Sequence, residues 1–252
     1  MDINGCVALV TGGNRGIGEG FVRELLGAGA LKVYAGSRDP KAASGLVAEF
    51  PGRCEAVELD VTDAAEVTAA AAACGDVNLL VNNSGAFTNR LLIGAPDMSG
   101  AREEMEVNYF GVLAMCRAFA PVLARNRGGA IVNVLSAAAL VNLPVMGGYP
   151  PSKAAARSLS AAVRAELADQ GTQVIALIVG SVDTRMASHV AGVKETVGDI
   201  ARAGLKAIKH GIEEMDTDAM AVEVRAGLAL DPKGLERRYA RMLRNPAIRT
   251  GR

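Results

Sequence analysis

A glycine-rich turn near the start of the chain constrains its fold more than any other feature. Residues 7–18 read VALVTGGNRGIG, a short apolar run followed by glycines spaced Gly-x3-Gly-x-Gly and by the start of a helical pattern. A pyrophosphate can approach backbone N–H groups at a helix N-terminus only where no Cβ obstructs it, and glycine also permits a positive φ. An ordinary strand-to-helix loop is the alternative, but the place of the turn in the chain favours a dinucleotide-binding turn. The residues predicted to bind the dinucleotide here are Gly12, Asn14, Arg15, Gly16, Ile17 and Gly18.

The rest of the chain alternates short apolar runs with longer helical patterns. The predicted strands are Val7–Val10, Lys32–Ala35, Cys54–Leu59, Leu79–Val81, Ala130–Leu135 and Val174–Val179. The predicted helices are Ile17–Ala28, Asp63–Ala73, Arg102–Arg125 and Tyr149–Gln170. This alternation predicts an α/β fold, a doubly wound parallel sheet with Rossmann-type topology and helices on both faces. No break in composition divides residues 1–252, so a single domain is expected.

The segment after the sixth strand is harder to assign. Residues 183–211 mix polar side chains with Gly192, Gly198 and Gly204. They follow a strand whose carboxyl end lies on the ligand side of such a sheet, so a substrate lid is predicted at about 183–211. The tail from Ile212 onward looks helical, and no clear seventh strand is found.

Charge and cysteine content argue against several classes of function. The chain has 27 Lys plus Arg and 27 Asp plus Glu, and this balance gives no sign of a nucleic acid or membrane partner. The four cysteines lack CxxC spacing, which predicts reduced, mostly buried thiols. His189 and His210 have no companions at metal-ligand spacing, so no metal site is expected. No secretory signal or membrane-spanning run is found, and a cytoplasmic location is expected.

The end of the second strand indicates which dinucleotide would bind. Proteins that prefer NAD usually carry an acidic residue there, which binds the ribose 2′-hydroxyl. Here that position falls near Ser37, the next residue is Arg38, and Arg15 lies close by in the glycine turn. Two guanidinium groups and a hydroxyl suit a 2′-phosphate, so NADP(H) is predicted over NAD(H). The alternative is that Arg38 and Asp39 form a solvated surface pair.

A tyrosine and a lysine four residues apart open the last predicted helix. Tyr149 and Lys153 share one helix face, and the two prolines between them are tolerated in a first turn. A free tyrosine has a pKa of about 10, which a nearby ammonium is expected to lower, so the pair is a candidate general acid and base. By itself, such a pair is more often the start of a surface helix.

Three further motifs change that balance. Ser136 lies at the carboxyl end of the fifth strand, the fourth strand ends in the run of residues 82–85, NNSG, and a long helix contains Asn108. Together with the glycine turn, these motifs resemble the short-chain dehydrogenase/reductase family in its compact single-domain branch, over roughly Met1 to Met186. The resemblance implies that Asn108, Ser136, Tyr149 and Lys153 form a catalytic tetrad.

The resemblance also implies a role for each of these residues. Tyr149 would donate or accept the proton, and Ser136 would hydrogen-bond the substrate oxygen. Lys153 would bind the ribose hydroxyls and depress the pKa of Tyr149, while Asn108 would hold a water that links Lys153 to solvent. The other residues that would contact NADP(H) are Asp60, Val61, Asn82, Ser84, Gly85, Gly180, Val182 and Thr184.

The chain departs from the family pattern after the sixth strand. Val179-Gly180 replaces the usual Pro-Gly, which is expected to loosen the following loop, and the C-terminal Asp-Gly-Gly stretch is missing. The missing stretch weakens the case for the usual tetramer contact, although a homodimer or homotetramer is implied by the resemblance.

The function predicted from these motifs is NADPH-dependent interconversion of a ketone or aldehyde and an alcohol. Residues 137–146 are mostly apolar and follow Ser136, which predicts an apolar substrate, with simple core packing as the alternative. Two other functions stay open: a catalytically silent NADP(H)-binding sensor, and an epimerase or dehydratase that keeps its nicotinamide bound.

Overall fold

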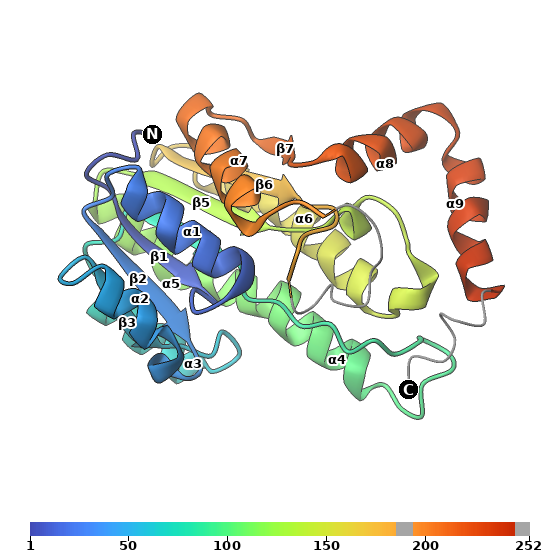
Figure 1. Ribbon diagram of the computed structural model, residues 1–252, viewed down its shortest axis with the longest axis horizontal. Coiled ribbons are helices and arrows are strands. Elements are labelled where there is room, and N and C mark those ends of the chain that lie inside the picture. Colours follow the sequence, from blue (N-terminus) through green and yellow to red (C-terminus); the bar gives the residue numbers. More distant parts are fainter. Residues whose placement is uncertain (185–193, 245–252) are drawn as a thin grey trace.

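The computed structural model describes residues 1–184 and 194–244, and a seven-stranded sheet forms its centre (Figure 1). The strands are β1 (Val7–Thr11), β2 (Lys32–Ser37), β3 (Cys54–Glu58), β4 (Leu79–Asn82), β5 (Gly129–Val134), β6 (Thr172–Ile178) and β7 (Glu214–Asp216). All neighbouring strands are parallel, in the order β3-β2-β1-β4-β5-β6-β7. The chain runs outward from β1 to β3, returns to β4 beside β1, and continues outward to β7. The predicted doubly wound, Rossmann-type sheet is therefore confirmed.

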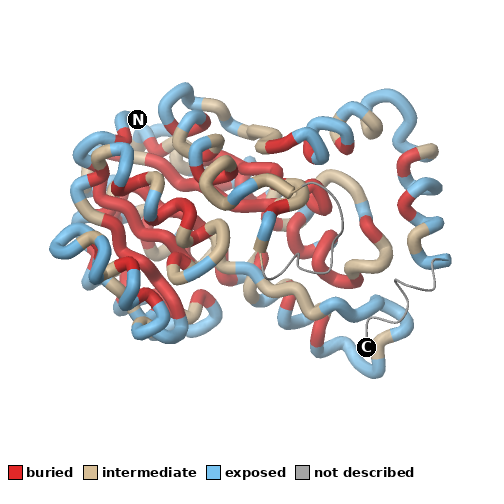
Figure 2. Tube along the Cα trace, in the orientation of Figure 1, coloured by how far each residue is buried: buried red, intermediate tan, exposed pale blue. Residues whose placement is uncertain are grey.

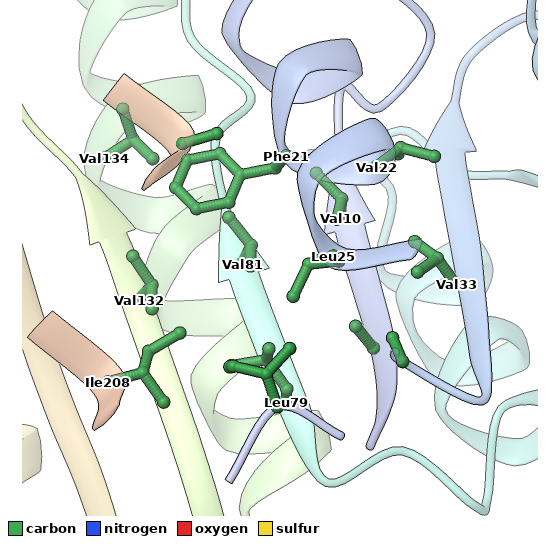
Figure 3. Close-up of a cluster of buried hydrophobic side chains, with 14 of the residues drawn as sticks. Val10, Phe21, Val22, Leu25, Val33, Leu79, Val81, Val132, Val134 and Ile208 are labelled. Atoms are coloured by element: carbon green, nitrogen blue, oxygen red, sulfur yellow. The ribbon is translucent and has the colours of Figure 1, made fainter. Parts of the chain in front are cut away.

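Helices cover both faces of the sheet. They are α1 (Gly16–Gly27), α2 (Ser44–Glu49), α3 (Ala64–Ala73), α4 (Ser99–Met105), α5 (Val112–Arg125), α6 (Tyr149–Glu166), α7 (Val197–His210), α8 (Ala219–Leu230) and α9 (Pro232–Ala240). Successive strand residues point to opposite faces, so side chains of the sheet contribute to an apolar layer on each face. In the layer of Figure 3, Val10 and Val132 of the sheet pack with Phe21 of α1 and Ile208 of α7. The other layer, which includes Leu80, packs against α3, α5 and α6.

A single long helical stretch, Ser99–Arg125, joins α4 to α5 through a π-helical turn, Glu106–Gly111. Within the described residues it is the one helix long and apolar enough to cross a membrane by length and composition. Core helices pass the same test, and Met115 and Phe119 on this helix are fully buried against the sheet. Its apolar face is thus used in the core.

Two sequence-based expectations about the region after β6 are wrong. A seventh strand exists: β7 pairs in parallel with β6 from Ala176 to Ile178. The predicted lid at 183–211 is too long, because α7 occupies its second half and lies beside α1 with Ile208 in the core (Figure 1). Residues 185–193, which include His189, lie outside the described residues.

The chain after β7 forms a C-terminal arm of α8, α9 and a short 3-10 turn, Arg241–Arg244 (Figure 1, right). Figure 2 shows that much of the arm is exposed, but Leu235 and Tyr239 on α9 are buried. These two side chains join a third apolar cluster, which also contains Leu143 and Tyr149. The arm therefore packs over the apolar stretch that follows Ser136.

Candidate active site

The glycine turn lies between β1 and α1, as predicted. Gly12 and Gly16 have φ values of +64° and +55°, in the left-handed region that side chains with a Cβ rarely adopt. Gly18 is required by close approach instead, since a Cβ there would lie 2.1 Å from the carbonyl oxygen of Gly12. The turn and the first N–H groups of α1, which lack intrahelical acceptors, make a cradle suited to a pyrophosphate.

Asn83, which sequence reasoning did not single out as a site residue, ties this turn to the end of β4. Its side-chain amide donates to the carbonyl oxygens of Thr11, at 2.9 Å, and Gly12, at 3.3 Å. The hydroxyl of Thr11 accepts in turn from the backbone N–H groups of Asn83 and Ser84, both at 2.9 Å. The run of residues 82–85 was visible in the sequence, but not which of its side chains would face the turn.

Asn82, predicted to bind the cofactor, has its side chain inside the protein. It is buried and donates to Asn133 Oδ1 of β5 at 2.9 Å, and Asn133 donates to Ser160 of α6 at 2.8 Å. This chain of hydrogen bonds connects two strands to α6. Only the backbone of Asn82 could face a ligand at the edge of the sheet.

The residues predicted to select NADP(H) lie at the carboxyl end of β2 and in the glycine turn after β1. Ser37 is buried and its hydroxyl donates to the carbonyl oxygen of Asp39 at 2.7 Å, whereas Arg15 and Arg38 are exposed. Burial opposes ionisation of Asp60, but hydrogen bonds from Thr62 and the charge of Arg38 together hold its pKa below the usual value. The charge of Arg38 thus reaches Asp60, at the edge of the sheet where the adenosine ribose of a dinucleotide would bind.

Val61, also predicted to contact the cofactor, packs against the π-helical turn. A Cβ on Gly111 would lie 2.6 Å from Val61 Cγ2, so the two residues are in close contact. The side chain of Val61 is buried in the second apolar layer. The predicted contact of Val61 with adenine would therefore come mainly from its backbone. Asn14 is half-buried in the glycine turn, and Ile17 packs against the first layer.

Ser136, Tyr149 and Lys153 meet where β5 ends and α6 begins. Ser136 lies close enough to the Tyr149 hydroxyl to act on its pKa, and Lys153 Nζ lies 5.8 Å from the centre of the Tyr149 ring. Lys153 Nζ donates to the carbonyl oxygen of Val134 at 3.0 Å. Gly85 borders the same space, because a Cβ there would lie 3.7 Å from Lys153 Nζ. The structure therefore brings together the residues that sequence reasoning grouped, although their catalytic roles stay a prediction.

Burial controls the ionisation of this pair. It raises the pKa of Tyr149 to about 12, a change that the nearby Ser136 side chain opposes and the charge of Glu104 reinforces. Burial also lowers the pKa of Lys153 to about 8. The net shift of the Tyr149 pKa is therefore upward, opposite to the lowering expected from Lys153, whose own effect on this pKa stays a prediction. The Tyr149 hydroxyl is held protonated at neutral pH, which suits a proton donor.

Asn108 lies in the π-helical turn, a feature that sequence reasoning missed and that often marks functional sites. Its Oδ1 accepts from the backbone N–H of Ala86 at 2.9 Å, and a Cβ on Gly85 would lie 3.3 Å from that oxygen. Its amide group donates to the carbonyl oxygen of Ala86 and to Ser152, both at 2.9 Å. Asn108 thus holds the loop after β4 against the first turn of α6.

The segment after β6 lies close to the glycine turn. A Cβ on Gly16 would lie 3.7 Å from Thr184 Cγ2, and Val182 is buried and forms a β-bridge with Glu195. The backbone N–H of Gly180 donates to Asp218 at the start of α8 at 2.6 Å, while the looser loop expected from Val179 in place of a proline stays a prediction. The loop that would face a nicotinamide is tied to the C-terminal arm.

Replacing Asp218 with Ala should lower the free energy of unfolding by about 2–4 kcal/mol, because it removes a helix cap and leaves the partly buried N–H of Gly180 without an acceptor. Asp218 accepts from Gly180 and from the N–H of Ala221. Asp231→Ala is the matched control, since Asp231 caps α9 through Gly234 alone and is exposed. Urea unfolding measures both, and equal losses would contradict the role given to Asp218.

No group of three His, Cys, Asp or Glu side chains within residues 1–184 and 194–244 could hold a metal ion. The constellation around Tyr149 offers a protonated hydroxyl, the nearby hydroxyl of Ser136, and the buried amine of Lys153. Beside it lies a glycine cradle of the kind that binds dinucleotide phosphates. The chemistry that this arrangement supports is proton transfer next to a bound dinucleotide.

Comparisons with known proteins agree with this geometry. The family model of short chain dehydrogenases matches residues 6–195. Galactitol 2-dehydrogenase of Agrobacterium fabrum is 35% identical over 188 residues, 73% of each protein. A short chain dehydrogenase from Burkholderia cenocepacia, solved in complex with NADP, is 44% identical with a TM-score of 0.90 and covers 95% of this chain and 99% of its own. A short chain dehydrogenase/reductase from Burkholderia phymatum, solved with NAD, is 25% identical with a TM-score of 0.81 over 91% and 96% of the two chains.

Proposed function

The chain belongs to the short chain dehydrogenase family of oxidoreductases, and from this premise we propose that it uses NADPH to interconvert a ketone or aldehyde and an alcohol. The observation that carries the proposal is the meeting of Ser136, Tyr149 and Lys153 beside Gly85 and the glycine turn. A protein that only senses a nucleotide needs the cradle but has no use for a protonated phenol held against a hydroxyl.

The reaction divides between the cofactor and the side chains. NADPH, when bound, supplies the hydride. The protonated Tyr149 hydroxyl donates its proton to the carbonyl oxygen, and Ser136 donates a hydrogen bond that orients that oxygen. Lys153 lies close enough to stabilise the phenolate that proton transfer leaves behind. In the oxidative direction the same phenolate takes the proton back.

The glycine cradle fits a dinucleotide, and two arginines, one in the glycine turn and one after β2, support the NADP form. Arg38 and Arg15 are exposed at this edge, where a 2′-phosphate would find two guanidinium groups. The two solved relatives bind NADP and NAD respectively, so kinship alone does not decide between the cofactors. The proposal therefore depends on Arg38 and has a direct test.

Arg38→Asp should lower kcat/KM for NADPH by roughly 10- to 100-fold, since a hydrogen bond to a charged group contributes about 1.5–3 kcal/mol. The value for NADH should stay level or rise, because the new carboxylate can accept from a ribose hydroxyl. Lys41→Asp makes the same charge change on the neighbouring exposed turn and should leave the ratio as it is. An unchanged NADPH/NADH ratio in the Arg38 variant would reject the assignment.

The third apolar cluster supports an apolar substrate. Phe87, Leu143 and Met146 surround the position of Tyr149, and the C-terminal arm adds Leu235 and Tyr239. The test of the whole function is a panel of ketones and aldehydes, incubated with NADPH and followed by absorbance of the reduced nicotinamide. NADPH binding without turnover of any member would favour a silent sensor. Nicotinamide that co-purifies with the protein would favour an epimerase or dehydratase.

A further inference from the structure

Glu104 is a buried carboxylate beside the site, and neither the family resemblance nor the mechanism above assigns it a role. Its Oε1 accepts from the backbone N–H of Thr88 at 2.7 Å and from the Thr88 hydroxyl at 2.9 Å. Its Oε2 is buried and has no hydrogen-bond partner among the described residues. A Cβ on Gly148 would lie 2.6 Å from that oxygen, so Oε2 faces the start of α6. Burying a carboxylate without a countercharge costs several kcal/mol, which a glutamine would avoid at this position.

Glu104 and Asn108 act on the same loop. They are four residues apart, one turn along the helical stretch. Asn108 holds the backbone of Ala86 and Glu104 holds that of Thr88, so both neighbours of Phe87 are fixed. The Phe87 ring packs edge-to-face on Tyr149, with ring centres 5.4 Å apart and planes at 66°. Glu104 therefore helps to hold the loop from which Phe87 contacts the Tyr149 ring.

Among the described residues, Glu104 is the acidic group whose charge acts on the Tyr149 hydroxyl, and it raises the pKa of that hydroxyl. The other titratable groups around Tyr149 are Lys153 on its own helix and Tyr239 of α9, which shares the apolar cluster. Arg90 presents its backbone to Gly147, while its guanidinium is exposed and donates to a serine. A negative charge facing the start of α6 disfavours the phenolate and so favours the proton-loaded phenol.

We propose that Glu104 is a positioning residue for the reaction, which holds Phe87 against Tyr149 and keeps the Tyr149 hydroxyl in its proton-donating form. The inference deepens the proposed function and rests on it for its catalytic meaning. It favours the form of the site from which carbonyl reduction starts, because reduction needs the protonated phenol while oxidation needs the phenolate.

Two variants separate the effect of the Glu104 charge from the effect of its hydrogen bonds to Thr88. Glu104→Gln removes the charge and keeps an oxygen for Thr88. Glu104→Met removes both in an apolar side chain of similar length that a buried site accepts.

In both variants, the onset of Tyr149 ionisation should move to lower pH by about half a unit to one unit, as expected when a nearby like charge is lost. Only the Met variant should also lose kcat, by about tenfold, because Phe87 is released. Glu103→Gln, an exposed neighbour on the same helix, is the control and should cause no shift.

Ionisation is read without turnover, from the tyrosinate absorbance between pH 8 and 11.5. The chain has four tyrosines, so the trace of each variant that also carries Tyr149→Phe is subtracted. A shift to lower pH in the Gln variant supports the proposal, and kcat for alcohol oxidation at pH 8 should rise with it. An unchanged onset in both variants overturns it, even if kcat falls. A shift without any substrate reduced would leave the charge effect standing and reject the proposed function instead.

Discussion

Tyr149→Phe is expected to lower kcat for carbonyl reduction by about 10²–10⁴-fold, the range that a positioned general acid contributes. The Tyr149 ring is buried between Phe87 and the C-terminal arm, and phenylalanine fills the same volume, so the fold should be kept. What is removed is the hydroxyl whose pKa Ser136 and Glu104 influence. Steady-state NADPH oxidation with the best substrate of the panel measures the loss, and a Kd from nicotinamide fluorescence should stay near the wild-type value.

Tyr34→Phe is the matched control for this variant. Tyr34 is also a buried tyrosine whose hydroxyl is bonded, here to Asp76 at 3.0 Å, but it lies on β2 away from the site. Its loss should cost about 1 kcal/mol of stability and leave kcat unchanged. Full activity of the Tyr149 variant would remove the general acid from the mechanism, and equal losses of kcat in both variants would point to a stability effect.

The prediction of the fold succeeded where local pattern and position in the sheet agree. All six predicted strands are present, and their ends agree with the prediction within one or two residues. β7 was missed because it has only three residues, two of them acidic, and its pairing with β6 comes from contacts distant in sequence. The formation of β7 depends on its pairing with β6, which the residues of β7 alone do not indicate.

Helix α7 was mistaken for part of a lid because of its glycines. Gly204 reads as a loop residue, yet it lies mid-helix, where a Cβ would come within 2.6 Å of the Phe21 ring. The glycine serves close packing of α7 on α1. A local indication of the helix start was present, since Thr196 and Asp199 form a capping box, which marks a helix N-terminus in sequence.

The candidate site divides in the same way. Ser136, Tyr149 and Lys153 could be grouped from sequence because each follows a strand or shares a helix face at a fixed spacing. Glu104 and Asp218 could not, since each acts on a loop distant in sequence and has no motif around it. The direction of the Tyr149 pKa was missed for a related reason: the spacing suggests a nearby ammonium, but burial, which dominates, is set by the whole fold.

Gly18→Ala should raise the Kd for NADPH by at least about tenfold, which corresponds to about 1.4 kcal/mol, and should destabilise the protein by about 1–3 kcal/mol through overpacking. The new Cβ would lie 2.1 Å from the carbonyl oxygen of Gly12 and 2.6 Å from the amide nitrogen of Asn83. Both are parts of the turn itself, so relief requires α1 to move away from β1 or the Asn83 bonds to break. Either movement displaces the N–H groups that would receive the phosphates.

Gly27→Ala tests whether that loss is specific to the turn. Gly27 ends the same helix, and a Cβ there would meet nothing within 4 Å. Replacing it should leave the Kd for NADPH as it is and could only stabilise α1, by up to about 1 kcal/mol. Fluorescence titration with NADPH and urea unfolding of the two variants give the comparison. If Gly18→Ala bound NADPH as tightly as Gly27→Ala, the cradle at residues 12–18 would not hold the phosphates, and the placement of the nicotinamide beside Tyr149 would lose its anchor.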